Sequence, residues 1–200
     1  MKFVLEIEGF TLEKGFVFKE LTLWSLQNNF DRHFFVKPPC PFNWLSEKDK
    51  RIVKYCEKFI HKIHWSAGRD TFLEVRSYLQ RLLNDTTNSV VVYTKGESKI
   101  NVFKQVLGLK CEIQDINQLE LKSNQEWNED LKKYMESINS TEFCPLKFHT
   151  NHSHCTQVKA AVIAEFLNSY INKDECMFTE EPPVSMETEE MRRTDEEEAH

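Results

Sequence analysis

The apolar residues of this chain change their spacing at Pro38-Pro39. Before these prolines, apolar and polar residues alternate, as in residues 2–10, where Glu6 and Glu8 share the polar face. After the prolines, apolar residues recur every three or four positions. Alternation is typical of half-buried strands, and the longer period is typical of amphipathic helices. The chain must therefore combine an N-terminal sheet with helices that come later.

Further elements follow from the same patterns. Three strands are predicted before the prolines, at 2–10, 16–25 and 30–36, and consecutive strands at this spacing form an antiparallel meander. The apolar run 89–93 is typical of a buried parallel strand, and residues 111–116 predict another. Helices are predicted after Ser46, near Asp70, after Gly96, around Trp127–Ile138 and over 155–170. The fold class is therefore α/β, with a mixed sheet that has helices on both faces.

The last part of the chain differs in composition from the rest. From Lys173 to His200 there are eleven acidic and three basic residues, a net charge of −8. Because the whole chain carries −6, residues 1–172 carry +2. This segment has few large apolar side chains, so it cannot bury enough surface to fold. We predict one domain, residues 1–171, followed by a disordered acidic tail, residues 172–200.

The sequence shows no segment for membrane insertion or secretion. No apolar run approaches the roughly 20 residues that a transmembrane helix needs. Met1–Glu8 alternates and contains two acids, unlike the apolar region of a signal peptide. The six cysteines are spread out, and in a reducing compartment they are packing residues or metal ligands. We expect an intracellular protein, cytoplasmic or nuclear, that does not associate with a membrane.

Cysteine and histidine residues are concentrated between Cys144 and Cys155. Five thiol or imidazole groups lie within these twelve residues, in a loop without apolar periodicity. Zinc takes four N, S or carboxylate ligands, and its binding energy could order such a loop. Cys144 and Cys155 are the first candidate ligands, and His149 is the next, with His152 as its rival. The alternative is that both cysteines are small buried apolar residues and the histidines belong to a polar loop.

The order of elements resembles the ribonuclease H-like fold, and the DEDD-type 3′–5′ exonucleases in particular. The residues that carry this likeness are spread over residues 1–170. Val4–Glu8 stands where these enzymes place an Asp-x-Glu pair on the first strand. Residues 90–99 and 154–159 stand where they place the third and the last carboxylate. The resemblance implies two divalent ions, held by carboxylates, that promote phosphodiester cleavage.

The carboxylates that such a centre needs are incomplete in this chain. Glu6 and Glu8 could supply two of them and are the candidate catalytic residues. Residues 94–99 contain no Asp, and the last position is Lys159, whose charge repels a cation. The sequence therefore argues against a two-metal exonuclease.

One branch of this superfamily, the Maelstrom domain of the piRNA pathway, has lost its catalytic acids in a similar way. That branch carries a Glu–Cys–His–Cys zinc set, with the Glu on the second strand and the other ligands at the start of the last helix. In this sequence Glu20 lies on the second predicted strand, and Cys144, His149 and Cys155 lie at the start of the last helix. The resemblance thus implies a structural zinc ion with Glu20 as its fourth ligand.

Three functions are compatible with these features. The first is a catalytically degenerate exonuclease-like domain, a pseudoenzyme with structural Zn²⁺ that binds single-stranded RNA or a protein, in a role related to small RNA (piRNA) or transposons. The second is an active metal-dependent 3′–5′ exonuclease or single-stranded RNA nuclease, with Mg²⁺ or Mn²⁺ on Glu6 and Glu8. The third is a protein-interaction adaptor that uses the acidic tail. The missing carboxylates favour the first.

Overall fold

The computed structural model describes residues 1–27, 30–85, 87, 89–119, 126, 129, 132, 133 and 155–177, with residues 170–177 described by their backbone alone. The chain divides after Leu167 into one unit, Met1–Leu167, and a second unit, Asn168–His200. The sheet and the candidate site belong to the first unit.

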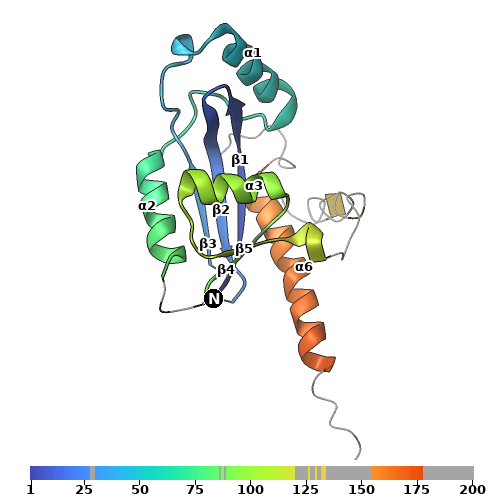
Figure 1. Cartoon of the computed structure of the whole chain (residues 1–200). Helices are drawn as coiled ribbons and strands as arrows, with labels where there is room; N and C mark the ends of the chain where they lie inside the picture. The colour runs from blue at the N-terminus through green and yellow to red at the C-terminus, as the bar shows by residue number, and fades with distance from the viewer. Residues whose placement is uncertain are drawn as a thin grey trace, which may run out of the picture. The chain divides into compact units, whose positions relative to one another are not determined.

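A mixed sheet of five described strands, in the order β3-β2-β1-β4-β5, forms the centre of the first unit (Figure 1). The strands are β1 (Lys2–Leu12), β2 (Gly15–Ser25), β3 (Asp31–Phe35), β4 (Val91–Thr94) and β5 (Glu112–Asp115). β1 and β3 are antiparallel to β2, whereas β4 is parallel to β1 and β5 is parallel to β4. The predicted meander and both predicted parallel strands are therefore confirmed.

Capping hydrogen bonds mark the starts of two predicted helices, at the predicted N-cap Ser46 and at Thr71, next to Asp70. The Oγ of Ser46 accepts a hydrogen bond from the backbone N–H of Asp49 at 3.1 Å, and Thr71 forms a reciprocal capping box with Glu74. The helices are α1 (Glu47–Tyr55), α2 (Phe72–Leu83), α3 (Glu97–Val102) and α6 (Thr156–Met177). Shorter turns are the 3-10 turns η1 (Phe42–Trp44) and η4 (Ile116–Leu119) and the π-helical turns η2 (Cys56–Ile60) and η3 (Phe103–Leu107). The residues on which a further helix is predicted, Trp127, Leu131, Tyr134 and Ile138, lie outside the described part of the chain.

Helices cover both faces of the sheet, as predicted. On one face, α2 and η3 pack against the strands in a core that includes the fully buried Leu5, Leu79 and Leu107. On the other face, Val4 of β1 belongs to a second core with Ile163 of α6. Burying a side chain of this size contributes about 1.5–3 kcal/mol. Both layers therefore stabilise the sheet.

A register shift in the β1–β2 pair lies between Glu8 and Gly9. A Cβ at position 9 would lie 2.1 Å from the backbone oxygen of Val17, so the close approach of the two strands requires glycine there. Before this shift β1 alternates regularly, which puts Val4, Glu6 and Glu8 on one face. Because Val4 packs with α6, both glutamates face the same helix.

The last described helix is longer than the sequence predicts. α6 continues past the predicted domain boundary at residue 171 and ends at Met177. The rest of the predicted acidic tail, residues 178–200, lies outside the described residues. Among the residues that the structure describes, no helix combines the length and the apolar character that crossing a bilayer requires.

Candidate metal centre

The sheet face covered by α6 carries polar side chains on three neighbouring strands. Glu6 and Glu8 lie on β1, Glu20 on β2 and His33 on β3. The register places Glu20 opposite Glu8 and Thr22 opposite His33, so these side chains share one face. Glu6 is 1% exposed and Glu20 is fully buried. Carboxylates are almost never buried so completely unless they are paired or bind a metal.

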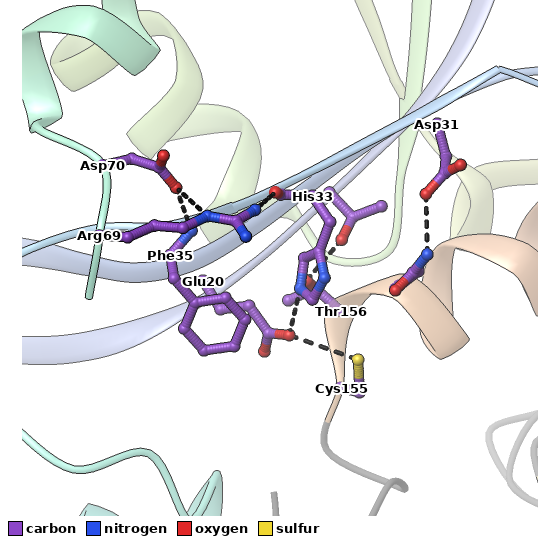
Figure 2. A network of polar contacts seen from close by, with 10 residues as sticks. Glu20, Asp31, His33, Phe35, Arg69, Asp70, Cys155 and Thr156 are labelled. Atoms are coloured by element: carbon purple, nitrogen blue, oxygen red, sulfur yellow. Dashed lines mark hydrogen bonds and ion pairs between the residues drawn. The ribbon is translucent and has the colours of Figure 1, made fainter. Parts of the chain in front are cut away.

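Glu20, His33 and Cys155 form a compact cluster at the start of α6 (Figure 2). One potential ligand atom of each residue lies within 4.8 Å of the others. The Nε2 of His33 lies 2.6 Å from the Oε1 of Glu20, and the Sγ of Cys155 donates to the same oxygen at 3.4 Å. The side chains of Glu20 and His33 are 0% and 8% exposed, and Cys155 is fully buried. Together these three residues could bind a metal ion.

Polar contacts hold the first turn of α6 on this part of the sheet. Cys155 directly precedes the helix, and the hydroxyl of Thr156 lies 2.7 Å from that of Thr22 on β2. The next residue, Gln157, donates to the carboxylate of Asp31 on β3 at 2.8 Å. The start of α6 is therefore attached to both strands that carry the cluster, which keeps the Cys155 thiol close to Glu20.

A loop between η2 and α2 supports the outer strand β3, which carries His33. Arg69 donates through Nη2 to the carbonyl of His33 at 2.8 Å, and the Oδ2 of Asp70 accepts from the backbone N–H of Phe35 at 2.8 Å (Figure 2). The ring of Phe35 contacts the imidazole of His33 edge-on, with 5.0 Å between centroids. These contacts restrain both the backbone and the ring of His33.

Two of the predicted zinc ligands lie together in this cluster. Glu20 on β2 and Cys155 before α6 are in hydrogen-bond contact. The other predicted ligands, Cys144 and His149 with its rival His152, lie outside the described residues. The part of the ligand set that the structure describes is therefore the pair contributed by the second strand and the last helix.

His33 lies in the cluster but is not among the predicted ligands. Alternation within the predicted strand 30–36 puts His33 on the same face as Phe35. The face of β2 that it meets depends on the β2–β3 register, in which Phe35 lies opposite Glu20. Alternation within one strand does not show which residue of the neighbouring strand lies opposite.

Glu6 is surrounded by donors from the end of β4 and from α3. Its carboxylate accepts hydrogen bonds from the hydroxyl of Thr94 at 3.2 Å and from the backbone N–H of Lys95 at 3.3 Å. It also forms an ion pair with Lys99. All three partners belong to residues 94–99, the segment in which the resemblance places the third carboxylate. An ammonium group thus contacts Glu6 from that segment.

Glu8 is paired with a lysine in the same way. Its partner is Lys159 of α6, and the two side chains are 19% and 23% exposed. Burial lowers the pKa of Lys159, but the charges of Glu8, Glu6 and Glu20 outweigh it, so the pKa is raised above its ordinary value. Lys159 therefore stays protonated at neutral pH and neutralises Glu8. Lys159 stands at the position where the exonucleases that this chain resembles carry their last metal-binding acid.

Asp115, at the end of β5, is a further buried carboxylate near this end of the sheet. It is 5% exposed, and its Oδ1 accepts from the backbone N–H groups of Gly96 at 3.0 Å and Asn117 at 2.9 Å. The first contact fixes the loop after β4, and the second fixes the turn after β5. Asp115 therefore shapes both segments.

The polar residues of this face divide into two neighbouring sites. Near β3, an oxygen, a nitrogen and a sulfur donor could bind a metal ion. Near β4, carboxylates are neutralised by lysines. Neither a protein-family model nor a curated protein matches this chain.

Proposed function

We propose that this chain contains a catalytically degenerate ribonuclease H-like domain, similar to the Maelstrom domain, that binds single-stranded RNA or a protein without cleaving it. The antiparallel meander, the added parallel strands and the helices on both faces support this fold. The observation that carries the proposal is the pairing of Glu6 with Lys99 and of Glu8 with Lys159. The resemblance relates such a role to small RNA or transposons.

The lysine pairs are incompatible with two-metal catalysis on simple electrostatic grounds. A two-metal centre needs carboxylates whose negative charge is available to divalent cations. Here two ammonium groups already contact these carboxylates, and a Mg²⁺ ion beside them would be repelled by both. An ammonium group balances charge, but it cannot bind and activate the attacking water as a metal does. The two lysines thus balance the charges of Glu6 and Glu8 in place of metal ions, but they do not take over the catalytic role of such ions.

The neighbouring cluster, in this proposal, holds a structural zinc ion. Zinc accepts oxygen, nitrogen and sulfur donors together, whereas Mg²⁺ requires oxygen. Two ligand atoms on one tetrahedral zinc lie about 3.3–3.8 Å apart, and the 3.4 Å between Glu20 and Cys155 fits that spacing. His33 lies 2.6 Å from Glu20, which is shorter than a ligand–ligand distance and fits a residue that orients the carboxylate.

A zinc ion at this position would join β2 to the start of α6. Cys144 and one of the two histidines, His149 or His152, would complete the ligand set that the resemblance implies. Four protein ligands leave no position for a reactive water, so the ion would stabilise the domain and take no part in catalysis. Its binding free energy would contribute directly to folding.

Elemental analysis tests the metal part of the proposal. We expect one zinc per chain in the wild type and none in Cys155→Ser, together with a lower melting temperature after chelation. Cys111→Ser changes a thiol outside the cluster and should keep its zinc. A wild-type protein without zinc would contradict the structural metal site.

A nuclease assay tests the loss of catalysis. Single-stranded RNA and DNA incubated with the wild type and Mg²⁺ or Mn²⁺ should remain intact. Cleavage that disappears in Glu6→Ala/Glu8→Ala would instead establish the alternative function, a metal-dependent nuclease that uses these two acids. Cleavage that persists in this variant would point to a contaminating enzyme.

A further inference from the structure

The outer surface of α1 and η2 combines basic and aromatic side chains. Its exposed residues recur at positions i, i+3, i+4, i+7 and i+8, namely Arg51, Lys54, Tyr55, Lys58 and Phe59. This spacing gathers them on one side of a helix, whereas Val53 is fully buried on the other side. We call these five residues the basic–aromatic face. Figure 1 shows α1 near one end of β1. All five residues of the basic–aromatic face are exposed.

Two of the three acidic residues of the same segment are buried or largely buried. Asp49 is 6% exposed and accepts a hydrogen bond from a backbone N–H in the β1–β2 turn at 3.0 Å. Glu57 is largely buried and accepts from the backbone N–H of Trp65. The third, Glu47, is exposed; it forms an ion pair with Lys50 at 2.7 Å, and its hydrogen bond with Lys50, followed by the charges of Lys50, Lys54 and Arg51, lowers its pKa. Among the acidic residues of this described segment, it is the one beside the three basic residues of this face. Positive charge therefore predominates on the basic–aromatic face.

Two aromatic rings are exposed among these charges. Tyr55 and Phe59 are 57% and 56% exposed, with their ring centroids 5.3 Å apart. The Nζ of Lys58 lies 5.0 Å from the centroid of the Phe59 ring. Adjacent apolar rings in water are characteristic of a contact surface. Exposed rings beside cations are the combination with which proteins bind unpaired bases and their phosphates.

The opposite side of α1 and η2 packs on the domain. Val53 of α1 and Cys56 of η2 belong to a core cluster with Phe10 of β1 and the buried Trp65. This packing fixes the segment on the domain and leaves the basic–aromatic face on its outer side.

We infer that the basic–aromatic face binds single-stranded RNA, with bases stacked on Tyr55 and Phe59 and phosphates held by Arg51, Lys54 and Lys58. This inference rests on the proposed non-cleaving function and specifies its partner and its contact surface. Stacking uses the face of a base, which every base has, so binding is tolerant of sequence. In a duplex the bases already stack on one another, so double-stranded RNA binds more weakly.

Fluorescence anisotropy with a short, labelled single-stranded RNA of mixed sequence tests the inference. Tyr55→Ala and Phe59→Ala should each weaken binding about fivefold or more, because each ring supports one stacked base. In Lys54→Ala/Lys58→Ala, the slope of log affinity against log salt should become shallower by about 1.4, since two phosphate contacts are lost. An unchanged melting temperature verifies that each variant is folded.

Two controls change an exposed apolar side chain and an exposed lysine elsewhere on the surface. Leu73→Ala removes an apolar side chain of α2 that is 70% exposed, and Lys110→Ala removes an exposed charge before β5. Both controls should bind the RNA as the wild type does. The inference is supported only if the variants of the basic–aromatic face lose affinity and these controls do not.

Other outcomes separate this inference from the proposed function. If the wild type binds RNA and the face variants bind equally well, the surface assignment is wrong while an RNA-binding function stands. If the wild type binds no RNA at low salt, the assignment of RNA as the partner fails as well. Binding to phosphatidylserine vesicles in the absence of RNA binding would overturn the inference in favour of an anionic lipid surface.

Discussion

Lys19 on β2 is fully buried, and its ammonium group is surrounded by backbone carbonyls. Its Nζ donates to the carbonyl oxygens of Val36 at 2.9 Å and of Trp65 at 2.8 Å, and also to that of Ala67. One side chain thus joins β2 to the residue after β3 and to the loop before α2. We predict that Lys19→Met destabilises the domain strongly, because the carbonyls lose their common donor.

Two opposing contributions determine the size of this effect. Each of the three hydrogen bonds of Lys19 has a charged donor and contributes about 1.5–3 kcal/mol. Against this, burial lowers the pKa of Lys19 to about 8, although the charge of Glu57 opposes the shift. A shift of this size corresponds to about 3 kcal/mol of unfavourable free energy at neutral pH. We therefore expect Lys19→Met to lose about 2–5 kcal/mol of stability.

The same pKa gives the effect a pH dependence. The pKa of Lys19 is about 8 in the folded state and near 10.5 in the unfolded state. Between these values the unfolded state binds more protons, so the stability of the wild type rises with pH. From pH 7.5 to 9.5 the contribution of Lys19 to this rise is about 1–2 kcal/mol. Lys19→Met lacks it, so the difference in stability between the two proteins widens.

Urea unfolding at pH 7.5 and 9.5, followed by circular dichroism under reducing conditions, measures both effects. The other titrating groups are common to the two proteins, so the difference between them isolates Lys19. Lys110→Met changes an exposed lysine and should stay within about 0.5 kcal/mol of the wild type. A difference that remains constant or narrows with pH would refute the reasoning, because it would mean that Lys19 stays protonated.

Further changes test single contacts. Lys159→Met should cost about 1–3 kcal/mol in urea unfolding, because it leaves Glu8 in a largely buried position, and adding Glu8→Gln should recover most of that loss. Thr71→Ala removes the capping box of α2 and should cost about 1 kcal/mol in thermal unfolding. Thr22→Val should cost about 1–2 kcal/mol, because the buried hydroxyl of Thr156 loses its partner, and Thr22→Val/Thr156→Val should cost less than twice that amount.

Apolar spacing was sufficient to predict most of the described strands and helices. The predicted strands 2–10, 16–25, 30–36 and 89–93 correspond to β1 to β4 within a few residues, since each must bury one face or both. The shift at Gly9 could not be predicted in this way. It arises from the close approach of the two strand backbones, and the spacing of side chains carries no information about it.

The candidate site was less predictable because it depends on contacts between distant parts of the chain. Glu20 and Cys155 come from the second strand and the last helix, and only the resemblance paired them in advance. His33 reaches Glu20 through the β2–β3 pairing, and alternation within one strand does not show which residue of the neighbouring strand lies opposite. The lysine at position 159 is visible in the sequence, whereas its contact with Glu8 requires α6 to pack on this face.

The first turn of α6 positions residues of both sites. The backbone N–H of Lys159 donates to the carbonyl of Cys155 at 3.1 Å, so the thiol beside Glu20 and the ammonium beside Glu8 lie one turn apart. If a metal ion holds Cys155, losing it should loosen this turn and weaken the contact between Lys159 and Glu8. In a Cys155→Ser background, the coupling energy between Glu8→Gln and Lys159→Met should fall by about 0.5–2 kcal/mol in a double-mutant cycle measured by urea unfolding. An unchanged coupling energy would show that the two sites are independent, because the metal would then have no effect on the contact between Lys159 and Glu8.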